Sequence, residues 1–225
     1  MVKYSAVIFD FDGTVARTAE DVWDSVRYGF ESCGLTLPES FSGDSRNLFN
    51  APGDMVEMLY PGSDPALRLR VDEGVAHHYR EITSYPNTVL FPGIRELLEL
   101  LLAEGIPTGI LSNKAHPALG RVLEVKGWGR YFTSYRGSLE SDGDLSDKVA
   151  RLREYKKQFD LTDPVYVGDS ASDVIAAKAN GFHSVGLLYG DGDPALVRES
   201  RPDVLCETPE ELRAYFEKGC VSHAE

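Results

Sequence analysis

The sequence has 225 residues and a formal net charge of −13, from 36 acidic and 23 basic residues. The length allows one large domain or two smaller ones, and the acidic balance argues against nucleic acids and anionic membranes as partners. No signal peptide or membrane-spanning run is recognisable, and the three cysteines are widely spaced, so we expect a cytoplasmic protein without a disulfide framework.

The first predicted strand, residues 6–9, is an apolar run typical of a strand covered on both faces. It ends at Asp10, and Asp12 follows two positions later, so both carboxylates can point the same way at the carboxyl end of the strand. Ligands of open α/β sheets bind at such ends. Two adjacent carboxylates repel each other unless a cation or a proton separates them. The pair therefore indicates a metal site and suits phosphoryl transfer to an aspartate, whereas an ordinary Asp-Gly turn is the alternative.

Residues 16–86 have a helical pattern, with apolar side chains at near-helical spacing over 22–33 and again over 67–82. The stretch 41–62 between them is rich in Gly, Ser, Asn and Pro, which predicts turns around a short helix at 55–59. Arginines in this segment could recognise a carboxylate or a second phosphate, with an ordinary surface position as the alternative. The candidates are Arg46, Arg70 and Arg80, while Arg17 and Glu20 lie nearer in sequence to the first two aspartates.

After Pro92 the chain alternates between helices and strands, which predicts a parallel sheet with right-handed crossovers. An amphipathic helix runs from Ile94 to Gly105, with Leu102 on its apolar face, and the next strand covers residues 107–111. That strand ends at Ser112 and Asn113, whose side chains can donate hydrogen bonds to a phosphate or can cap a helix. Further strands are predicted at residues 131–135, 165–167, 184–188 and 203–206, and the acidic stretch 141–144 is predicted to be a turn rather than a calcium loop.

The strand at residues 165–167 leads to a second pair of acids, Asp169 and Asp173, which are four positions apart. The pair could hold a hard cation such as Mg2+, or Asp169 could merely cap the helix that begins near Ala171. Lys148 opens another predicted helix, where a fixed ammonium would offset negative charge on a nucleophile and a phosphoryl group. Lys114 is a rival for that role.

These segments together resemble the haloacid dehalogenase superfamily of phosphohydrolases, in the order and at the separations typical of that family. The four matching segments are residues 10–14, residues 111–113, Lys148 and residues 168–173, and the stretch 186–212 is similar to the phosphoglycolate phosphatase branch. The resemblance implies an α/β fold with a Rossmann-like parallel sheet and helices on both faces. This core would comprise residues 1–15 and 87–225, and residues 16–86 would form an inserted α-helical cap that closes over the site.

The resemblance also implies roles for individual residues. Asp10 would be the nucleophile and a Mg2+ ligand, and Asp12 would be the general acid and base and would bind Mg2+ through its backbone carbonyl. Asp169 would complete the metal site with support from Asp173. The phosphoryl group would be bound by Gly13, Thr14, Ser112, Asn113 and Lys148, the last of which would also be catalytic. Relatives commonly have proline directly after this lysine, whereas this chain has Val149.

The second aspartate distinguishes activities within the family. Dehalogenases lack it and use no Mg2+, so Asp12 favours a Mg2+-dependent phosphatase that hydrolyses a small phosphomonoester, such as phosphoglycolate, through an aspartyl-phosphate. The alternatives are a phosphomutase such as β-phosphoglucomutase, a nucleotide phosphatase or pyrophosphatase, and a non-enzymatic module that binds a phosphorylated ligand. The expected partner is a small phosphorylated metabolite, and the expected state is a monomer or a weak homodimer.

Overall fold

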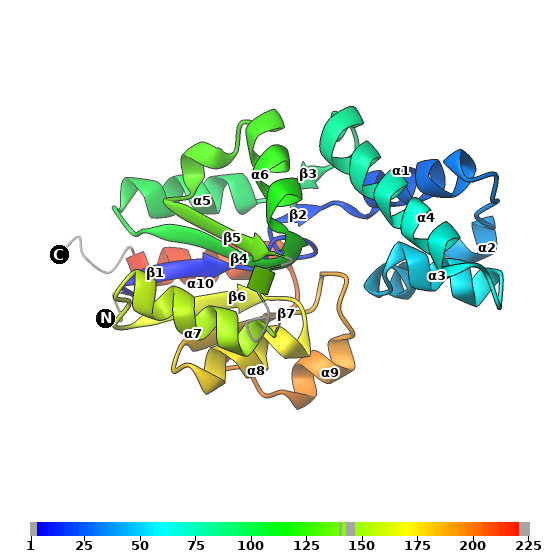
Figure 1. Ribbon diagram of the computed structural model, residues 1–225. Coiled ribbons are helices and arrows are strands. Elements are labelled where there is room, and N and C mark those ends of the chain that lie inside the picture. The colour runs from blue at the N-terminus through cyan, green and yellow to red at the C-terminus, as the bar shows by residue number, and fades with distance from the viewer. Residues whose placement is uncertain (1–3, 140, 143–146, 221–225) are drawn as a thin grey trace. The chain divides into compact units, whose positions relative to one another are not determined.

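The structure, a computed structural model, describes residues 4–139, 141–142 and 147–220 (Figure 1). The chain divides into two compact units. One unit contains residues 1–17 and 89–225 and holds the sheet, and the other contains residues 18–88 and is helical. Each of these boundaries lies two residues beyond the predicted one, which was after residue 15 or after residue 86.

Six strands of the described chain form one sheet, in which every neighbouring pair is parallel. Their order across the sheet is β5-β4-β1-β6-β7-β8. Their bounds are β1 Ala6–Phe9, β4 Thr108–Ala115, β5 Ser134–Ser138, β6 Pro164–Gly168, β7 His183–Leu187 and β8 Val204–Cys206. The predicted parallel α/β fold is confirmed.

Strand β1 lies inside the sheet, between β4 and β6, and its four residues are all buried, as the unbroken apolar run predicts. Ile8 lies in register with Gly109 of β4 on one side and with Tyr166 of β6 on the other. The chain builds the sheet outward from β1 in both directions, so the carboxyl end of β1 is a topological switch point. Ligands of open α/β sheets bind at that place.

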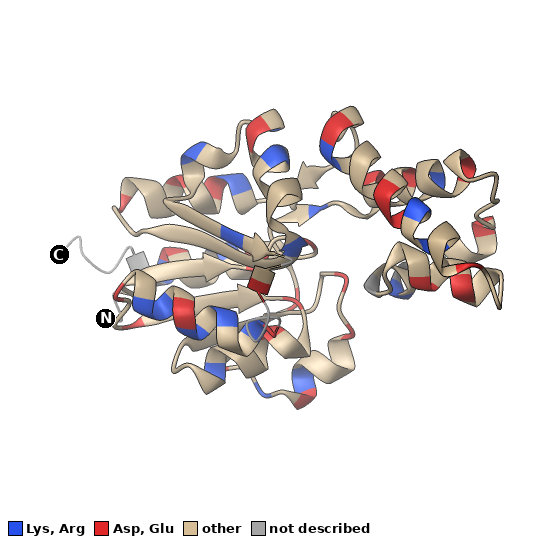
Figure 2. Cartoon of the chain, viewed as in Figure 1, with Lys and Arg blue, Asp and Glu red and all other residues tan. Residues whose placement is uncertain are grey.

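Helices cover both faces of this sheet. Helices α5 (Ile94–Ala103), α6 (His116–Val125) and α10 (Pro209–Cys220) lie on one face, and α7 (Lys148–Gln158), α8 (Ala171–Ala179) and α9 (Pro194–Glu199) lie on the other (Figure 1). Charged residues are concentrated on helices and loops, and few lie in the strands (Figure 2). No helix in the described part of the chain combines the length and apolarity that crossing a membrane requires.

Helix α5 follows its predicted apolar face with one exception. Ile94, Leu97, Leu98 and Leu101 are fully buried, whereas Leu102 is 55% exposed. Adjacent positions on a helix lie about 100° apart, so Leu102 falls outside the stripe that Leu98 and Leu101 share. Its prediction as a core residue is wrong. Gly105 follows the helix with a φ of 66°, the left-handed conformation that favours glycine beyond a helix end.

Two strand predictions are shifted. The strand that was expected at residues 131–135 is β5, Ser134–Ser138, because Gly129–Tyr131 form a 3-10 turn first. The Tyr131 carbonyl accepts a hydrogen bond from the Thr108 hydroxyl, which fixes this turn against the start of β4. Strand β4 extends past its predicted end at residue 111 to Ala115, with an irregularity after Leu111. The polar residues that were expected to follow the strand therefore lie within it.

A small antiparallel pair was not predicted. Strands β2 (Ala16–Arg17) and β3 (Val89–Leu90) pair beside the turn that follows β1. Each has two residues, which is too short to show a period in the sequence. This pair fixes both chain segments in the sheet unit, at the points where the chain passes into the helical unit and comes back from it.

The helical unit has its own apolar core. Its elements are α1 Ala19–Ser32, α2 Glu39–Ser42, the 3-10 helix η1 Ser45–Phe49, α3 Pro52–Leu59, α4 Pro65–His77 and the π-helical turn η2 His78–Ile82. Helices α1 and α4 pack so closely that a Cβ on Gly29 would lie only 2.8 Å from the Val71 carbonyl oxygen. The buried core residues are Trp23, Val26, Phe30, Leu37, Met55, Val56 and Val71.

A buried carboxylate of the first helix links the two ends of the helical unit. Asp21 accepts hydrogen bonds from the Asn87 backbone and side chain and from the Thr88 hydroxyl, the last at 2.6 Å. It is 1% exposed. These contacts join the beginning of the unit to its end.

Candidate active site

The polar groups singled out from the sequence gather at the carboxyl ends of the central strands. Asp10 directly follows β1, Ser112 lies in β4, and Asp169 directly follows β6. The Asp10 backbone N–H donates to the Val167 carbonyl at 2.8 Å, so the pairing of β1 with β6 continues to the acid itself. The sheet therefore places the three strand ends beside one another.

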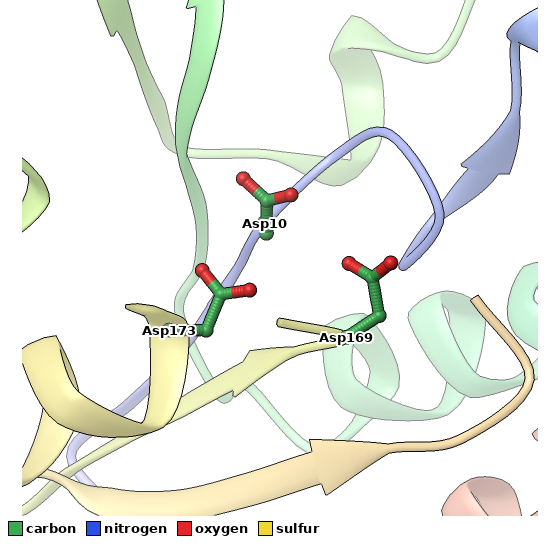
Figure 3. Close-up of side chains that lie close together, drawn as sticks. All are labelled: Asp10, Asp169 and Asp173. Carbon is green, nitrogen blue, oxygen red and sulfur yellow. The ribbon is translucent and has the colours of Figure 1, made fainter. Parts of the chain in front are cut away.

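Asp10, Asp169 and Asp173 point toward one another (Figure 3). One carboxylate oxygen of each lies within 4.8 Å of the others, and the residues are 7%, 5% and 1% exposed. Close, buried carboxylates repel each other strongly, so this cluster requires positive charge.

Lys148 supplies part of that charge. It is the first residue of α7, and Asp147 caps this helix by accepting from the Ala150 N–H. The buried Nζ lies 3.0 Å from Asp10 Oδ1 and 2.5 Å from Asp173 Oδ1. Both lysines that the sequence left in competition are in the site, because Lys114 Nζ lies 3.0 Å from Asp12 Oδ1. Lys148 contacts the predicted nucleophile, and Lys114 contacts the predicted acid and base.

Burial changes the protonation of these groups. It raises the pKa of Asp10 to about 7, with Lys148 opposing the rise and the neighbouring acids adding to it. Burial likewise raises the pKa of Asp169 to about 6, and the Asp173 charge adds to this. For Lys148, burial favours the neutral form, but the Asp10 and Asp173 charges outweigh it and hold its pKa well above the ordinary range. The Lys148 ammonium therefore stays charged. Its single positive charge is not enough to keep the pKa values of Asp10 and Asp169 at their ordinary level.

Asp169 is held by a close-fitting cradle. Its Oδ1 accepts from the Thr14 hydroxyl at 3.0 Å, and its Oδ2 accepts from the Asp191 and Gly192 N–H groups at 2.8 and 3.0 Å. Gly13 has a φ of 75°, and a Cβ there would lie 2.3 Å from Asp169 Oδ2. Thr14, which the resemblance assigns to the phosphoryl group, therefore orients Asp169 with its hydroxyl.

Asp173 and Ser170 form the capping box of α8. The Ser170 hydroxyl accepts from the Asp173 N–H, and Asp173 Oδ2 accepts from the Ser170 N–H at 2.9 Å. The alternative in which Asp169 caps this helix is therefore wrong, because Ser170 is the capping residue. Asp169 is left facing the carboxylate cluster.

Ser112 and Asn113 lie near the end of β4. Ser112 is buried, and its hydroxyl accepts from the Lys114 N–H at 3.3 Å. Neither residue caps a helix, because the residue before α6 is Ala115. Asn113 is exposed, and its side-chain oxygen accepts from an Arg151 guanidinium nitrogen.

Sequence reasoning missed three contributors to this site. Arg151 lies one turn after Lys148 on α7, a spacing that puts both on one helix face, and this was the available signal. The Asp191 and Gly192 backbone groups come from the loop after β7, within a stretch that was noted only for its resemblance. Tyr166, inside β6, donates from its buried hydroxyl to the Leu111 carbonyl at 2.6 Å. Nothing in the strand pattern reveals that contact.

Other candidate residues have partners of their own. Arg46 forms an ion pair with Asp44 at 2.6 Å, and its side chain is 84% exposed. Of the acidic stretch 141–144, residues 143 and 144 lie outside the described residues, and Asp142 accepts from Arg136 and from the Leu139 N–H. Cys33 and Cys206 are free cysteines, and the side chain of Cys220 is not among those described.

The donor set fits a Mg2+ ion. This hard cation prefers oxygen ligands and is commonly bound by one or two carboxylates together with waters. Asp10 and Asp169 offer such oxygens, and their raised pKa values indicate that a cation would stabilise their ionised forms. Asp173 is already engaged by Lys148 and Ser170, which suits a supporting position.

Comparison with known proteins places the chain in context. The family model described as haloacid dehalogenase-like hydrolase matches residues 7–187. A phosphoglycolate phosphatase of Pseudomonas fluorescens (strain Pf0-1) is 28% identical over 230 residues, covering 97% of this chain and 80% of that protein. A 5'-nucleotidase of Pseudomonas aeruginosa is 27% identical over 221 residues, covering 96% of this chain and 97% of that protein.

Solved structures show the same fold. A haloacid dehalogenase-like family hydrolase from Streptococcus pneumoniae superposes with a TM-score of 0.78 at 21% identity, covering 96% of this chain and 100% of that one. A protein from Haemophilus somnus 129PT, described as a predicted phosphoglycolate phosphatase, superposes with a TM-score of 0.81 at 21% identity, covering 96% and 99%.

Proposed function

Because the chain belongs to the haloacid dehalogenase-like hydrolases, we propose that it is a Mg2+-dependent phosphatase that acts on a small phosphomonoester through a phosphorylated Asp10. One observation carries this proposal. Asp10, Asp169 and Asp173 form a buried carboxylate cluster at the carboxyl end of the central strand, with Lys148 between two of them. This is an arrangement for binding a cation and an anion side by side.

The metal site in this proposal consists of the Asp10 and Asp169 carboxylates and the Asp12 backbone carbonyl. When bound, Mg2+ would supply positive charge that keeps Asp10 ionised and offsets charge on the phosphoryl oxygens. Thr14 and the Gly192 N–H hold Asp169 in a fixed orientation for this purpose. Asp173 acts indirectly, by orienting Lys148.

The chain's own groups carry out the transfer. An Asp10 carboxylate oxygen attacks phosphorus, forming the O–P bond while the bond to the leaving oxygen breaks. Asp12 donates a proton to that leaving oxygen and then takes one from the water that hydrolyses the phosphoaspartate. Lys148, Ser112 and Asn113 bind the phosphoryl oxygens, whereas the Gly13 N–H, which the resemblance also assigns to this group, donates to the Ala16 carbonyl. Positioning and charge stabilisation account for most of the catalysis in such reactions.

The substrate class rests on the relatives. A phosphoglycolate-like monoester is the first candidate because of the P. fluorescens phosphatase, and a nucleoside monophosphate is the second because of the P. aeruginosa 5'-nucleotidase. We assign the helical unit, residues 18–88, the role of a cap that selects the leaving group. The proposal includes the cytoplasm as the compartment, on the odd number and wide spacing of the cysteines.

A substrate panel tests this function. Release of inorganic phosphate is measured from phosphoglycolate, nucleoside monophosphates, sugar phosphates and pyrophosphate, each with Mg2+ and with chelator. The proposal expects Mg2+-dependent release from a small monoester, without a bisphosphate activator. Conversion of a sugar phosphate to its isomer without net release would instead indicate a mutase. Absence of any Mg2+-dependent release would refute the proposal.

A further inference from the structure

Arg151 is a buried cation next to the end of β4. It is 3% exposed, and it lies on the same face of α7 as Lys148. Its Nη1 donates to the Ser112 carbonyl at 2.8 Å, and its Nη2 donates to the Asn113 side-chain oxygen. One guanidinium therefore contacts both consecutive residues that are proposed to bind the phosphoryl group.

The contact with Asn113 fixes the orientation of its amide. A guanidinium can only donate hydrogen bonds, so the amide atom facing it must be the oxygen. The Asn113 NH2 group is then turned away from Arg151 and remains available as a donor. Without Arg151, the Asn113 amide could also turn its oxygen toward the phosphoryl group, and the two negative groups would repel each other.

Burying this guanidinium is expensive, which argues that the position has a role beyond packing. Burial lowers the pKa of Arg151, and the Asp142 carboxylate opposes this effect. Its buried Nε finds no hydrogen-bond partner among the described residues. An apolar side chain of similar volume would avoid both penalties. The hydrogen bonds that Arg151 donates to Ser112 and Asn113 oppose these penalties, and they are made to residues proposed to bind the phosphoryl group.

We propose that Arg151 is a positioning residue that orients Asn113 and the Ser112 backbone for binding the phosphoryl group. This inference rests on the proposed function and adds a residue to it. Helix α7 thus contributes two cations, of which Lys148 contacts the nucleophile and Arg151 orders the neighbouring strand end. Because both come from one helix, the donors from α7 and β4 are held in a fixed relation to each other.

Inorganic phosphate tests the inference as a competitive inhibitor of p-nitrophenyl phosphate hydrolysis at saturating Mg2+. Arg151→Met is expected to weaken inhibition by phosphate about tenfold and to raise KM similarly, because a charge-assisted hydrogen-bond pair is lost. Effects on kcat and on Mg2+ affinity should be smaller. Arg153→Met is the matched control, since Arg153 is an exposed arginine of the same helix, and it should behave like the wild type.

A double-mutant cycle tests whether Arg151 acts through Asn113. Asn113→Ala alone should weaken phosphate inhibition, and the double mutant should lose less than the sum of the two single losses, because Arg151 acts partly through Asn113. Arg151→Lys keeps the charge without the fork, so it should recover at most part of the loss. This variant also serves if Arg151→Met folds poorly.

Three results would overturn the inference. They are unchanged phosphate inhibition in Arg151→Met, independent effects in the double mutant, and full recovery by lysine, which would mean that charge alone matters. Each of them leaves an active wild-type phosphatase and so leaves the proposed function standing. A wild-type protein that neither hydrolyses phosphomonoesters nor is stabilised by inorganic phosphate against heat would contradict both.

Discussion

At the scale of single residues, the buried acids of the site are held in an unfavourable state that a bound cation would relieve. Burial raises the pKa values of Asp10 and Asp169 to about 7 and about 6, although each also accepts hydrogen bonds. The protein folds around these carboxylates despite their repulsion. Such strain at a functional site lowers stability in exchange for binding strength.

This strain predicts how the free energy of unfolding of the metal-free protein, kept so by a chelator, depends on pH. Because the folded pKa of Asp10 lies above the ordinary aspartate value of about 3.9, the folded state binds protons more tightly, and the free energy of unfolding falls as pH rises from about 4 to about 7. Asp10→Asn removes this contribution. It should gain on the order of 2 kcal/mol of stability relative to wild type between pH 5 and 7.5, as measured by urea unfolding.

Glu31→Gln controls for loss of one negative charge, since Glu31 is an exposed residue of α1. A difference between Asp10→Asn and wild type that does not change with pH, or that Glu31→Gln reproduces, would contradict the raised pKa of Asp10.

Lys148 should affect turnover and metal binding in opposite directions. Lys148→Met removes the ammonium that contacts Asp10 and Asp173, so hydrolysis should fall at least about 100-fold. The same change removes a positive charge beside the metal site, so Mg2+ should bind several-fold more tightly by calorimetry. Lys157→Met, on the exposed side of α7, should change neither quantity. Weaker Mg2+ binding in Lys148→Met would contradict this electrostatic account.

The sequence indicated most of the carboxylates and both lysines of the site, because strand ends and residue types are visible in it. It favoured Lys148 over Lys114 for a single role, and only the folded chain shows that each lysine contacts a different aspartate. Arg151 was missed because its two partners lie 38 and 39 positions away. Thr14 was assigned to the phosphoryl group, and the sequence did not show that its hydroxyl donates to Asp169.

At the scale of elements, the turn after β1 and the loop after β7 fit tightly around Asp169. Gly13 N–H donates to the Ala16 carbonyl at 3.0 Å, which closes the turn, and the Gly192 N–H approaches Asp169 from the other side. A Cβ on Gly192 would lie 2.1 Å from the Asp169 backbone oxygen. Two short backbone segments therefore fix the orientation of one carboxylate.

A pair of alanine substitutions separates crowding from backbone strain. Gly13 and Gly105 both have positive φ, but only at Gly13 would a Cβ contact Asp169, since nothing lies within 4 Å of one at Gly105. Gly105→Ala should lose about 1 kcal/mol of stability and keep wild-type Mg2+ affinity. Gly13→Ala should show the same strain and also bind Mg2+ at least about tenfold more weakly by calorimetry. Equal Mg2+ affinities in the two variants would contradict the claim that the turn at Gly13 holds Asp169 in position for Mg2+.

Elements were predictable where they are long and regular, and less so where tertiary contacts set their limits. Helix α5 and strand β1 follow their apolar patterns closely. Strand β5 begins three residues later than expected, because the turn at Gly129–Tyr131 comes first. The two-residue strands β2 and β3 exist only because they pair with each other, and no local pattern marks them.

At the scale of the whole molecule, a chain with a net charge of −13 is proposed to bind an anion. The summed charge repels a phosphomonoester at long range, while the lysines and Mg2+ attract it at short range. Salt screens the long-range repulsion first, because the Debye length falls from about 30 Å at 0.01 M to about 8 Å at 0.15 M.

Ionic strength should therefore increase the efficiency of the enzyme at first. We expect kcat/KM to rise about two- to fivefold between 0.01 and 0.15 M salt at fixed Mg2+. Sodium chloride and tetramethylammonium chloride should act alike, which controls for binding of a particular ion. A steady decrease of kcat/KM over this range would show that the local positive field dominates the encounter.

The parallel sheet could be predicted because strands that alternate with helices leave few other arrangements. The chain passes from one compact unit to the other at residues 17–18 and 88–89, two positions from the predicted boundaries at residues 15–16 and 86–87. The short β2–β3 pair accounts for the first difference, since it holds Ala16 and Arg17 in the sheet unit. The hydrogen bonds from Asn87 and Thr88 to Asp21 account for the second, since they hold residues 87 and 88 in the helical unit. The substrate could not be predicted, because leaving-group contacts depend on side chains that no motif marks.

The phosphorylated state of Asp10 tests the central claim most directly. The protein is mixed with Mg2+ and a hydrolysed phosphomonoester, quenched in acid within the first turnover, digested, and mapped by mass spectrometry. We predict one added phosphoryl group on the peptide that contains Asp10, absent with chelator and absent in Asp10→Asn. Phosphate release with no phosphorylated peptide, or with the group on another residue, would contradict the account.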